Sequence, residues 1–142
     1  MNLYEELLKY GFLTGSRAFG TNSDYDIVIP IYDLQDVKNI LNDQNISTEQ
    51  SNYFSGFKFS HEEKQINIIP VHPHEFLPWY LATKAMKASL KISGIKDRIK
   101  KHSIFMGIIC LYKGMVEELK NIENYVVLNK SLIEKENNGG PQ

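Results

Sequence analysis

Residues 25–29, Tyr-Asp-Ile-Val-Ile, most constrain how this chain can fold. β-Branched and aromatic residues favour an extended strand, and Pro30 is expected to end it because proline cannot donate to a strand ladder. The short apolar run at residues 12–15 predicts another strand, directly before a Gly-Ser-Arg sequence. Residues 13–30 therefore combine two short strands with a polar, glycine-bearing connection, and most of the functional information lies there.

The rest of the chain alternates between helical and extended patterns. Leucines at helical spacing before Gly11 predict a short helix over residues 2–10. Residues 53–71 contain two strand-like runs around His-Glu-Glu-Lys, which predicts a hairpin. Three further helices are predicted: one capped by Asp33 and running through Val37, Ile40 and Leu41, one starting at Pro78, and one over residues 95–120. The order helix, strand, strand, helix, two strands, two helices is typical of an α+β domain.

The predicted helix over residues 95–120 has a continuous apolar side, as expected of a helix that packs on a core. That side consists of Ile95, Ile99, Phe105, Ile109, Tyr112, Val116 and Leu119. Cys110 is the only cysteine and lies within the apolar run Ile-Phe-Met-Gly-Ile-Ile-Cys-Leu-Tyr, so we expect it to be a buried small hydrophobic residue.

Length and charge limit the class of protein. A chain of 142 residues is expected to form one domain, here residues 1–125, followed by a polar tail over residues 126–142 that is partly disordered. The net charge of −1 argues against a protein that coats nucleic acid nonspecifically. No apolar run reaches membrane-spanning length and the first residues lack the positive region of a signal peptide, which predicts a soluble cytoplasmic protein without a membrane partner.

Asp24 and Asp26 suggest a metal site. Side chains alternate along a strand, so the two carboxylates are predicted to project from the same face. Adjacent carboxylates repel unless a cation lies between them, and their hard oxygen atoms favour Mg²⁺ or Mn²⁺. The alternative is that both aspartates end a strand in solvent, because Ser-Asp-Tyr-Asp is also an ordinary turn composition. The aspartate pair alone favours that alternative.

The Gly-Ser-Arg sequence predicts an anion-binding turn, which would complement the metal-binding carboxylates of Asp24 and Asp26 in a phosphate site. Gly15 allows a tight turn and close approach to a ligand, while the Ser16 hydroxyl and the following N–H groups can donate to phosphate oxygens. Arg17 could add a planar, permanently charged donor that suits a triphosphate. Carboxylates for a metal ion and an anion cradle on neighbouring strands together predict a site for a metal–nucleoside triphosphate.

Residues 15–20, Gly-Ser-Arg-Ala-Phe-Gly, followed by residues 23–27, Ser-Asp-Tyr-Asp-Ile, resemble the glycine-serine and Asp-x-Asp signature of the DNA polymerase beta-like nucleotidyltransferase superfamily, in particular its minimal single-domain members. The resemblance rests on residues 11–30, and the order of elements extends it to about residue 120. It implies a small mixed sheet flanked by helices and two-metal transfer of a nucleoside monophosphate from a triphosphate to an acceptor hydroxyl. It also implies residue roles: Asp24 and Asp26 bind metal, and Gly15, Ser16 and Arg17 hold the triphosphate.

The sequence departs from the family at the third carboxylate position, which corresponds to Asn67 in the run Gln-Ile-Asn-Ile-Ile-Pro-Val. Alternation points Asn67 away from Ile66 and Ile68, so it can face the site while they fill the core. An amide oxygen can coordinate a metal, but it carries no negative charge and takes up no proton. Glu62 or Glu63 in the predicted hairpin turn is an alternative carboxylate, although turn glutamates are more often simply solvated.

Two functional hypotheses follow. The first is an active nucleotidyltransferase that modifies an RNA end, a small molecule or a protein side chain; a toxin–antitoxin or phage–host conflict system is one setting for it. The second is a catalytically impaired relative that binds nucleotide, or a partner protein, without turnover.

The remaining candidates carry weaker signals. Lys113 interrupts the apolar pattern of the last helix and is a further candidate for triphosphate binding. His61, His72 and His74 lack the spacing of metal ligands, so we expect them at the surface or hydrogen-bonded to ligands of the site rather than binding metal themselves. The basic residues of the last two helices are expected to form a solvated face, or to contact phosphates with Trp79 or Tyr80 as a stacking surface: Lys84, Lys87, Lys91, Lys96, Arg98, Lys100 and Lys101.

Overall fold

The computed structural model describes residues 2–19, 24–51 and 56–117. Five strands form one sheet in the order β1-β2-β5-β4-β3. Their bounds are Phe12–Thr14 (β1), Tyr25–Pro30 (β2), Glu49–Gln50 (β3), Phe57–His61 (β4) and Lys64–Val71 (β5). The central strands β2 and β5 are parallel and every other neighbouring pair is antiparallel, so the sheet is mixed.

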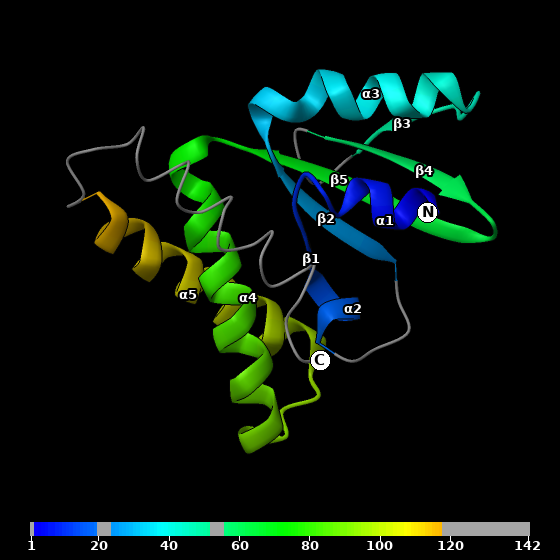
Figure 1. Cartoon of the computed structure of the whole chain (residues 1–142). Coiled ribbons are helices and arrows are strands. Elements are labelled where there is room, and N and C mark those ends of the chain that lie inside the picture. The colour runs from blue at the N-terminus through cyan, green and yellow to red at the C-terminus, as the bar shows by residue number, and fades with distance from the viewer. Residues whose placement is uncertain (1, 20–23, 52–55, 118–142) are drawn as a thin grey trace.

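Helices cover both faces of this sheet. Figure 1 shows α4 and α5 on one side of the sheet and α3 on the other, with the short α2 beside the end of β1. The helices are Leu3–Leu7 (α1), Gly15–Ala18 (α2), Leu34–Asp43 (α3), Pro73–Ser93 (α4) and Arg98–Val116 (α5), and a 3-10 turn spans Ile31–Asp33. The predicted α+β class with a small mixed sheet flanked by helices is confirmed.

Strand alternation separates two hydrophobic cores. Ile27 and Ile68 point toward α1 and α3, where they pack with Leu7, Val37 and other apolar residues. On the opposite face, a second core joins β1, β2 and β5 to α4 and α5. Its buried members are Phe12, Val28, Ile69, Val71, Phe76, Trp79, Ala82, Met86, Phe105 and Ile109. Burial on both faces explains why the central strands carry nearly continuous apolar runs.

The predicted start of the third helix, Pro78, is wrong. The helix α4 begins at Pro73, not at Pro78, and Pro78 lies buried inside it. Pro73 occupies the first helical position, where a missing N–H costs nothing. Pro73 and Pro78 both fit the preference for proline at the first helical position, so the local sequence does not distinguish them. The helix begins at Pro73, and Phe76, between the two prolines, packs in the core.

The start of the last helix also differs from the prediction over residues 95–120. Gly94, with a φ of 68°, ends α4, and Asp97 caps α5 by accepting a 2.9 Å hydrogen bond from the Lys100 backbone N–H. Ile99 is therefore not on a packed side and is 78% exposed. Cys110 is exposed too, so its predicted burial is wrong. Within the described part of α5, Phe105 and Ile109 are buried in the core, and the partly buried Ile104, Ile108 and Tyr112 pack against it, so the predicted Tyr112 does lie on the packed side.

Other boundaries shift by a few residues. The first helix is shorter than predicted, and Asn2 caps it by accepting from the Glu5 N–H at 2.8 Å. Pro30 belongs to β2 rather than following it, and the short edge strand β3 was not predicted. Asp33 precedes α3 as predicted but makes no capping hydrogen bond to it. Leu119 and the predicted tail over residues 126–142 lie outside the described residues.

Glu62 and Glu63 form the two-residue turn between β4 and β5, with φ values of 52° and 66°. This left-handed conformation costs non-glycine residues about 1–2 kcal/mol each, and two-residue hairpins prefer Asn-Gly there. We expect Glu63→Gly to raise the free energy of unfolding by about 1 kcal/mol. Urea denaturation measures the difference, and an unchanged midpoint would show that the turn is not strained.

Over the described residues, no helix combines the length and apolarity that crossing a bilayer requires.

Candidate functional site

A polar row crosses all five strands on the face that α4 and α5 partly cover. Cross-strand pairing places Thr14 opposite Asp26, Asp26 opposite Asn67, Asn67 opposite Lys58, and Lys58 opposite Glu49. Directly paired residues project from the same face of a sheet. The five side chains therefore lie in one line, buried at Thr14, half-buried from Asp26 to Lys58, and exposed at Glu49.

The neighbouring row on the same face is apolar and belongs to the core. Phe12 pairs with Val28, and Val28 pairs with Ile69. All three are buried under α4 and α5. The helices thus cover one end of this face, and the polar row marks where the packed core gives way to a partly solvated surface.

Asp26 and Asn67 are in direct contact at the centre of the row. The Asn67 Nδ2 donates a 2.8 Å hydrogen bond to Asp26 Oδ1. Burial raises the pKa of Asp26 above its usual value and the charge of Asp24 adds to the rise, whereas the bond from Asn67 opposes it. The predicted orientation of Asn67 toward the site is therefore present in the structure, with its amide serving as a donor to the carboxylate.

Asp24 and Asp26 form the acidic part of the site. Asp24 lies immediately before β2, is exposed, and is close enough to raise the pKa of Asp26. Two repelling carboxylates are a donor set that a divalent cation suits. Within residues 2–19, 24–51 and 56–117, no group of three or more His, Cys, Asp or Glu residues could hold a metal ion. The pair fits one cation whose other ligands come from elsewhere, and the two-metal arrangement stays a prediction.

Gly15 forms the wall of the site next to Asp26. It has a φ of 73°, and a Cβ built on it would overlap the Asp26 Oδ2. Only glycine allows both this backbone conformation and this approach. Ser16 and Arg17 follow directly in α2, where the predicted turn is a single helical turn. The backbone of the Gly-Ser-Arg sequence therefore meets the Asp26 carboxylate, as the sequence predicts.

The two predicted triphosphate cations have other partners. The Arg17 Nη2 donates to the Tyr25 hydroxyl at 2.6 Å, and its guanidinium lies 4.3 Å from the centre of that ring. Tyr25 packs on the face opposite to Asp26, so Arg17 turns away from the polar row. The Lys113 Nζ lies 3.7 Å from a carboxylate oxygen of Glu75, in the first turn of α4 beyond the carboxyl end of β5. The structure brings neither side chain to Asp26.

A buried pair of hydroxyls ties the row to α4. The Thr14 and Thr83 hydroxyl oxygens are 2.7 Å apart, and Thr83 donates to the Trp79 carbonyl at 2.8 Å. Since Thr83 has a single hydroxyl hydrogen, Thr14 is the donor to Thr83. This chain fixes the position of β1, and hence of Gly15, relative to α4.

We expect Thr83→Val to lower the free energy of unfolding by about 1–3 kcal/mol, because it leaves the Thr14 hydroxyl without its partner in the core. Urea denaturation measures this loss, with exposed Thr48→Val as the control. The double variant with Thr14→Val should cost less than the sum of the single changes. Additive losses would show that the two hydroxyls do not act together.

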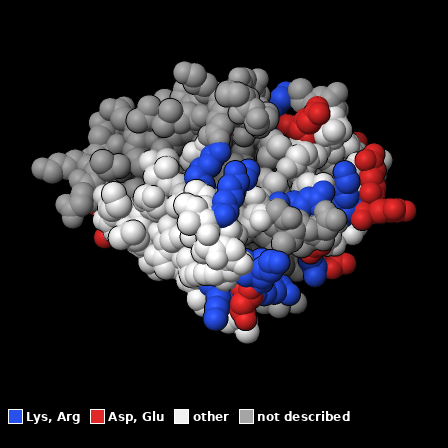
Figure 2. All heavy atoms as spheres, turned by 90° about the horizontal axis from the view of Figure 1, so that it is seen from below, with Lys and Arg blue, Asp and Glu red and all other residues white. Residues whose placement is uncertain are grey.

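The remaining candidates lie at the surface or in the core. His72 and His74 stack with ring centres 5.5 Å apart, while His61 lies 3.8 Å from Glu62. Trp79 is buried against Phe105 and cannot serve as a stacking surface. The seven basic residues predicted to form a solvated face are exposed apart from half-buried Lys101. On the face seen from below, basic side chains extend from the centre to the lower and right-hand margins, and the visible acidic ones lie near the margins (Figure 2).

Thr14, Thr83 and Lys58 are site residues that sequence reasoning missed. A two-residue turn at Glu62 and Glu63 fixes the hairpin register and places Lys58 opposite Asn67, so the loop length could have revealed it. No local signal could have joined Thr14 to Thr83, which are 69 residues apart. Together the residues offer two carboxylates for a cation, a glycine for close approach, and a row of polar groups leading away from them. Comparison with protein-family models, curated proteins and solved structures found no match for this chain.

Proposed function

We propose that this protein is a nucleotidyltransferase of the polymerase beta-like fold, which moves a nucleoside monophosphate from a triphosphate to an acceptor hydroxyl. The observation that carries the proposal is the position of Asp26, between Gly15 on β1–α2 and Asn67 on β5, with Asp24 beside it. The arrangement supports a metal–triphosphate site because it joins carboxylates to a backbone that a ligand can approach closely.

In this reaction the acceptor hydroxyl oxygen attacks the α-phosphorus, a new O–P bond forms, and the bond to pyrophosphate breaks. Asp24 and Asp26 would hold Mg²⁺ or Mn²⁺, which neutralises charge on the transferring phosphate. Gly15 leaves room beside the strand end for the Asp26 carboxylate that would hold the metal ion. Since the Asn67 amide takes up no proton, the hydroxyl proton leaves to water. The chain's own residues mainly position the reacting groups.

A second candidate function is binding of a nucleotide or a protein partner without turnover. The hydrogen bond from Asn67 to Asp26 favours it, because that bond uses one oxygen of the carboxylate on which metal binding depends. The replacement of a third carboxylate by an amide removes both a charge and a base. The two candidates share the same site and differ only in whether transfer occurs.

We expect a nucleoside triphosphate with Mg²⁺ to stabilise the folded protein by about 2.7 kcal/mol at about 100 times its Kd, which is a rise in Tm of several degrees. Asp26→Asn should abolish the shift, since it removes the charge while its amide oxygen can still accept from Asn67. Exposed Asp36→Asn, in the first turn of α3, is the matched control and should retain it. An equal shift in the Asp26 variant would contradict the site.

Transfer itself is tested by incubating the protein with each labelled triphosphate and Mg²⁺ or Mn²⁺, with RNA, protein and small-molecule acceptors in separate reactions. Label in an acceptor that is lost with Asp26→Asn supports the nucleotidyltransferase. Binding of the triphosphate without label in any acceptor supports the second candidate.

A further inference from the structure

A cavity of about 330 Å³ lies at the edge of the sheet, between β4 and the segment that leads from α3 into β3. The strand β3 pairs with β4 through Glu49 and Gln50. On the N-terminal side of that pair, residues 45–47 line the cavity together with residues of β4 and β5. Its volume is at the lower end for sites of small organic molecules, so it suits a compact ligand.

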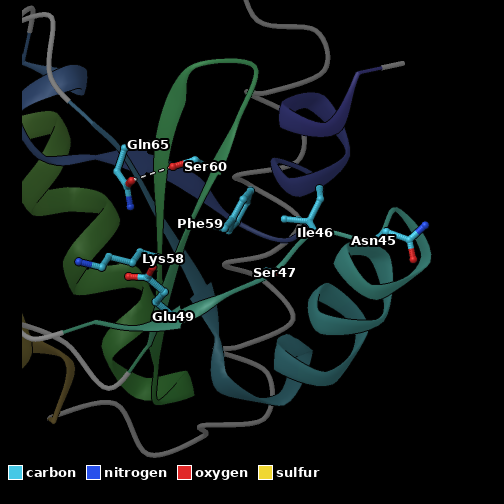
Figure 3. A pocket seen from close by; sticks show the side chains of 8 residues that line it. All are labelled: Asn45, Ile46, Ser47, Glu49, Lys58, Phe59, Ser60 and Gln65. Atoms are coloured by element: carbon cyan, nitrogen blue, oxygen red, sulfur yellow. Dashed lines mark hydrogen bonds between the residues drawn. The ribbon is translucent and has the colours of Figure 1, made fainter.

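The cavity is continuous with the polar row. Lys58 lines the cavity and is also the cross-strand partner of Asn67. Gln65 lines it too, and strand alternation puts Gln65 on the same face as Asn67, two residues away. Figure 3 shows Lys58, Glu49 and the Ser60–Gln65 pair along one side of β4, and Phe59 with Ile46 on the other. Several of its polar side chains therefore share a face with Asp26.

The cavity is lined by one positively charged residue, Lys58, and one negatively charged residue, Glu49. Lys58 is half-buried, and over the described part of the chain neither Lys58 nor the opposite Glu49 has an ion-pair partner. Glu49 is exposed and is stabilised by water, whereas a partly buried ammonium gains more from a nearby anion. Lys58 thus makes no ion pair within the described residues, although Glu49 is its cross-strand partner, and its ammonium group can pair with an anionic group of a ligand beside Asn67.

The other polar groups suit hydroxyls. Ser60 Oγ donates to Gln65 Oε1 at 3.2 Å, which leaves the Gln65 amide hydrogens and the Ser60 lone pairs for a ligand. Ser47, from the segment between α3 and β3, also lines the cavity. A mixture of donors and acceptors of this kind recognises a molecule with several hydroxyl groups.

We propose that this cavity is the acceptor subsite and takes a small polyhydroxylated molecule that carries a phosphate or carboxylate group. The ligand's anion pairs with Lys58, and a hydroxyl extends along the row past Asn67 toward Asp26. This assignment rests on the proposed function, because it identifies the molecule whose hydroxyl is nucleotidylated. It narrows the acceptor to a small molecule rather than an RNA end or a protein side chain.

The test uses the full chain without nucleotide. Ribose 5-phosphate, glycerol 3-phosphate and gluconate serve as anionic probes, and ribose, glycerol and sorbitol serve as their respective uncharged counterparts. Binding is followed by amide chemical shifts of residues 58–65 and by calorimetry. We expect at least one anionic probe to bind, its uncharged counterpart to bind at least about tenfold more weakly, and Lys58→Gln to cause a similar loss. Lys64→Gln, the same change on exposed Lys64 of the same hairpin, is the control and should bind normally.

Asp26→Asn separates this inference from the proposed function. It should retain probe binding while losing the shift with Mg²⁺ and triphosphate. Binding of none of the three anions, or equal affinities of the Lys58 and Lys64 variants, would overturn the acceptor subsite even where the triphosphate binds. Probe binding without any triphosphate binding would keep the cavity as an anion-binding site but overturn its role as an acceptor subsite.

Discussion

Asn67→Asp is expected to raise nucleotide transfer by about 10²–10⁴-fold over the native protein, which is the usual contribution of a general base. The change adds a carboxylate beside Asp26 with almost no change in volume, and it replaces the amide that now donates to Asp26 Oδ1. The new carboxylate can bind Mg²⁺ and accept the proton of the acceptor hydroxyl. Transfer of labelled nucleotide measures the change in rate, and calorimetric titration with Mg²⁺ measures the change in metal affinity.

The same substitution should destabilise the metal-free protein by about 1–3 kcal/mol, because a hydrogen bond is lost and two like charges meet in a half-buried site. Saturating Mg²⁺ should recover most of this loss. Exposed Asn42→Asp, in α3, adds the same charge away from the site and controls for net charge. If Asn67→Asp changes neither Mg²⁺ affinity nor transfer, Asn67 is not the third ligand position.

Gly15→Ala should both destabilise the fold and abolish triphosphate binding. A φ of 73° costs alanine about 1–2 kcal/mol, and the added Cβ would overlap the Asp26 carboxylate, which must then move. We expect a total loss of about 3 kcal/mol in the free energy of unfolding, together with loss of the Mg²⁺-triphosphate shift in Tm. Urea denaturation and thermal melts with and without ligand measure the two effects.

Gly94→Ala is the matched control for this prediction. Gly94 has a similar φ of 68°, but a Cβ there would meet nothing within 4 Å. It therefore shares the conformational cost without the contact, so its loss should be about 1 kcal/mol and its ligand response normal. Equal losses in the two variants, with triphosphate binding retained in both, would show that Gly15 acts only as a turn residue.

The local elements of the site could be predicted from sequence. Asp26 and Asn67 project from one face because side chains alternate along any strand, and the apolar residues on either side of each left little choice of face. The glycine at position 15 also signalled a turn correctly, because few other residues adopt its conformation. Helix ends were less certain where two signals competed, as at Pro73 and Pro78, since each satisfies the same local rule.

The sequence by itself determined the α+β class, the polar face of β2 and β5, and the glycine turn, because these depend on neighbours along the chain. Tertiary structure alone decided which cations reach the site. Arg17 is drawn to Tyr25, Lys113 to Glu75, and Lys58 faces Asn67. The partner of a long basic side chain is one of the groups that folding brings within its reach, and these groups come from separate elements. Strand order and helix packing set these distances, and no local pattern encodes them.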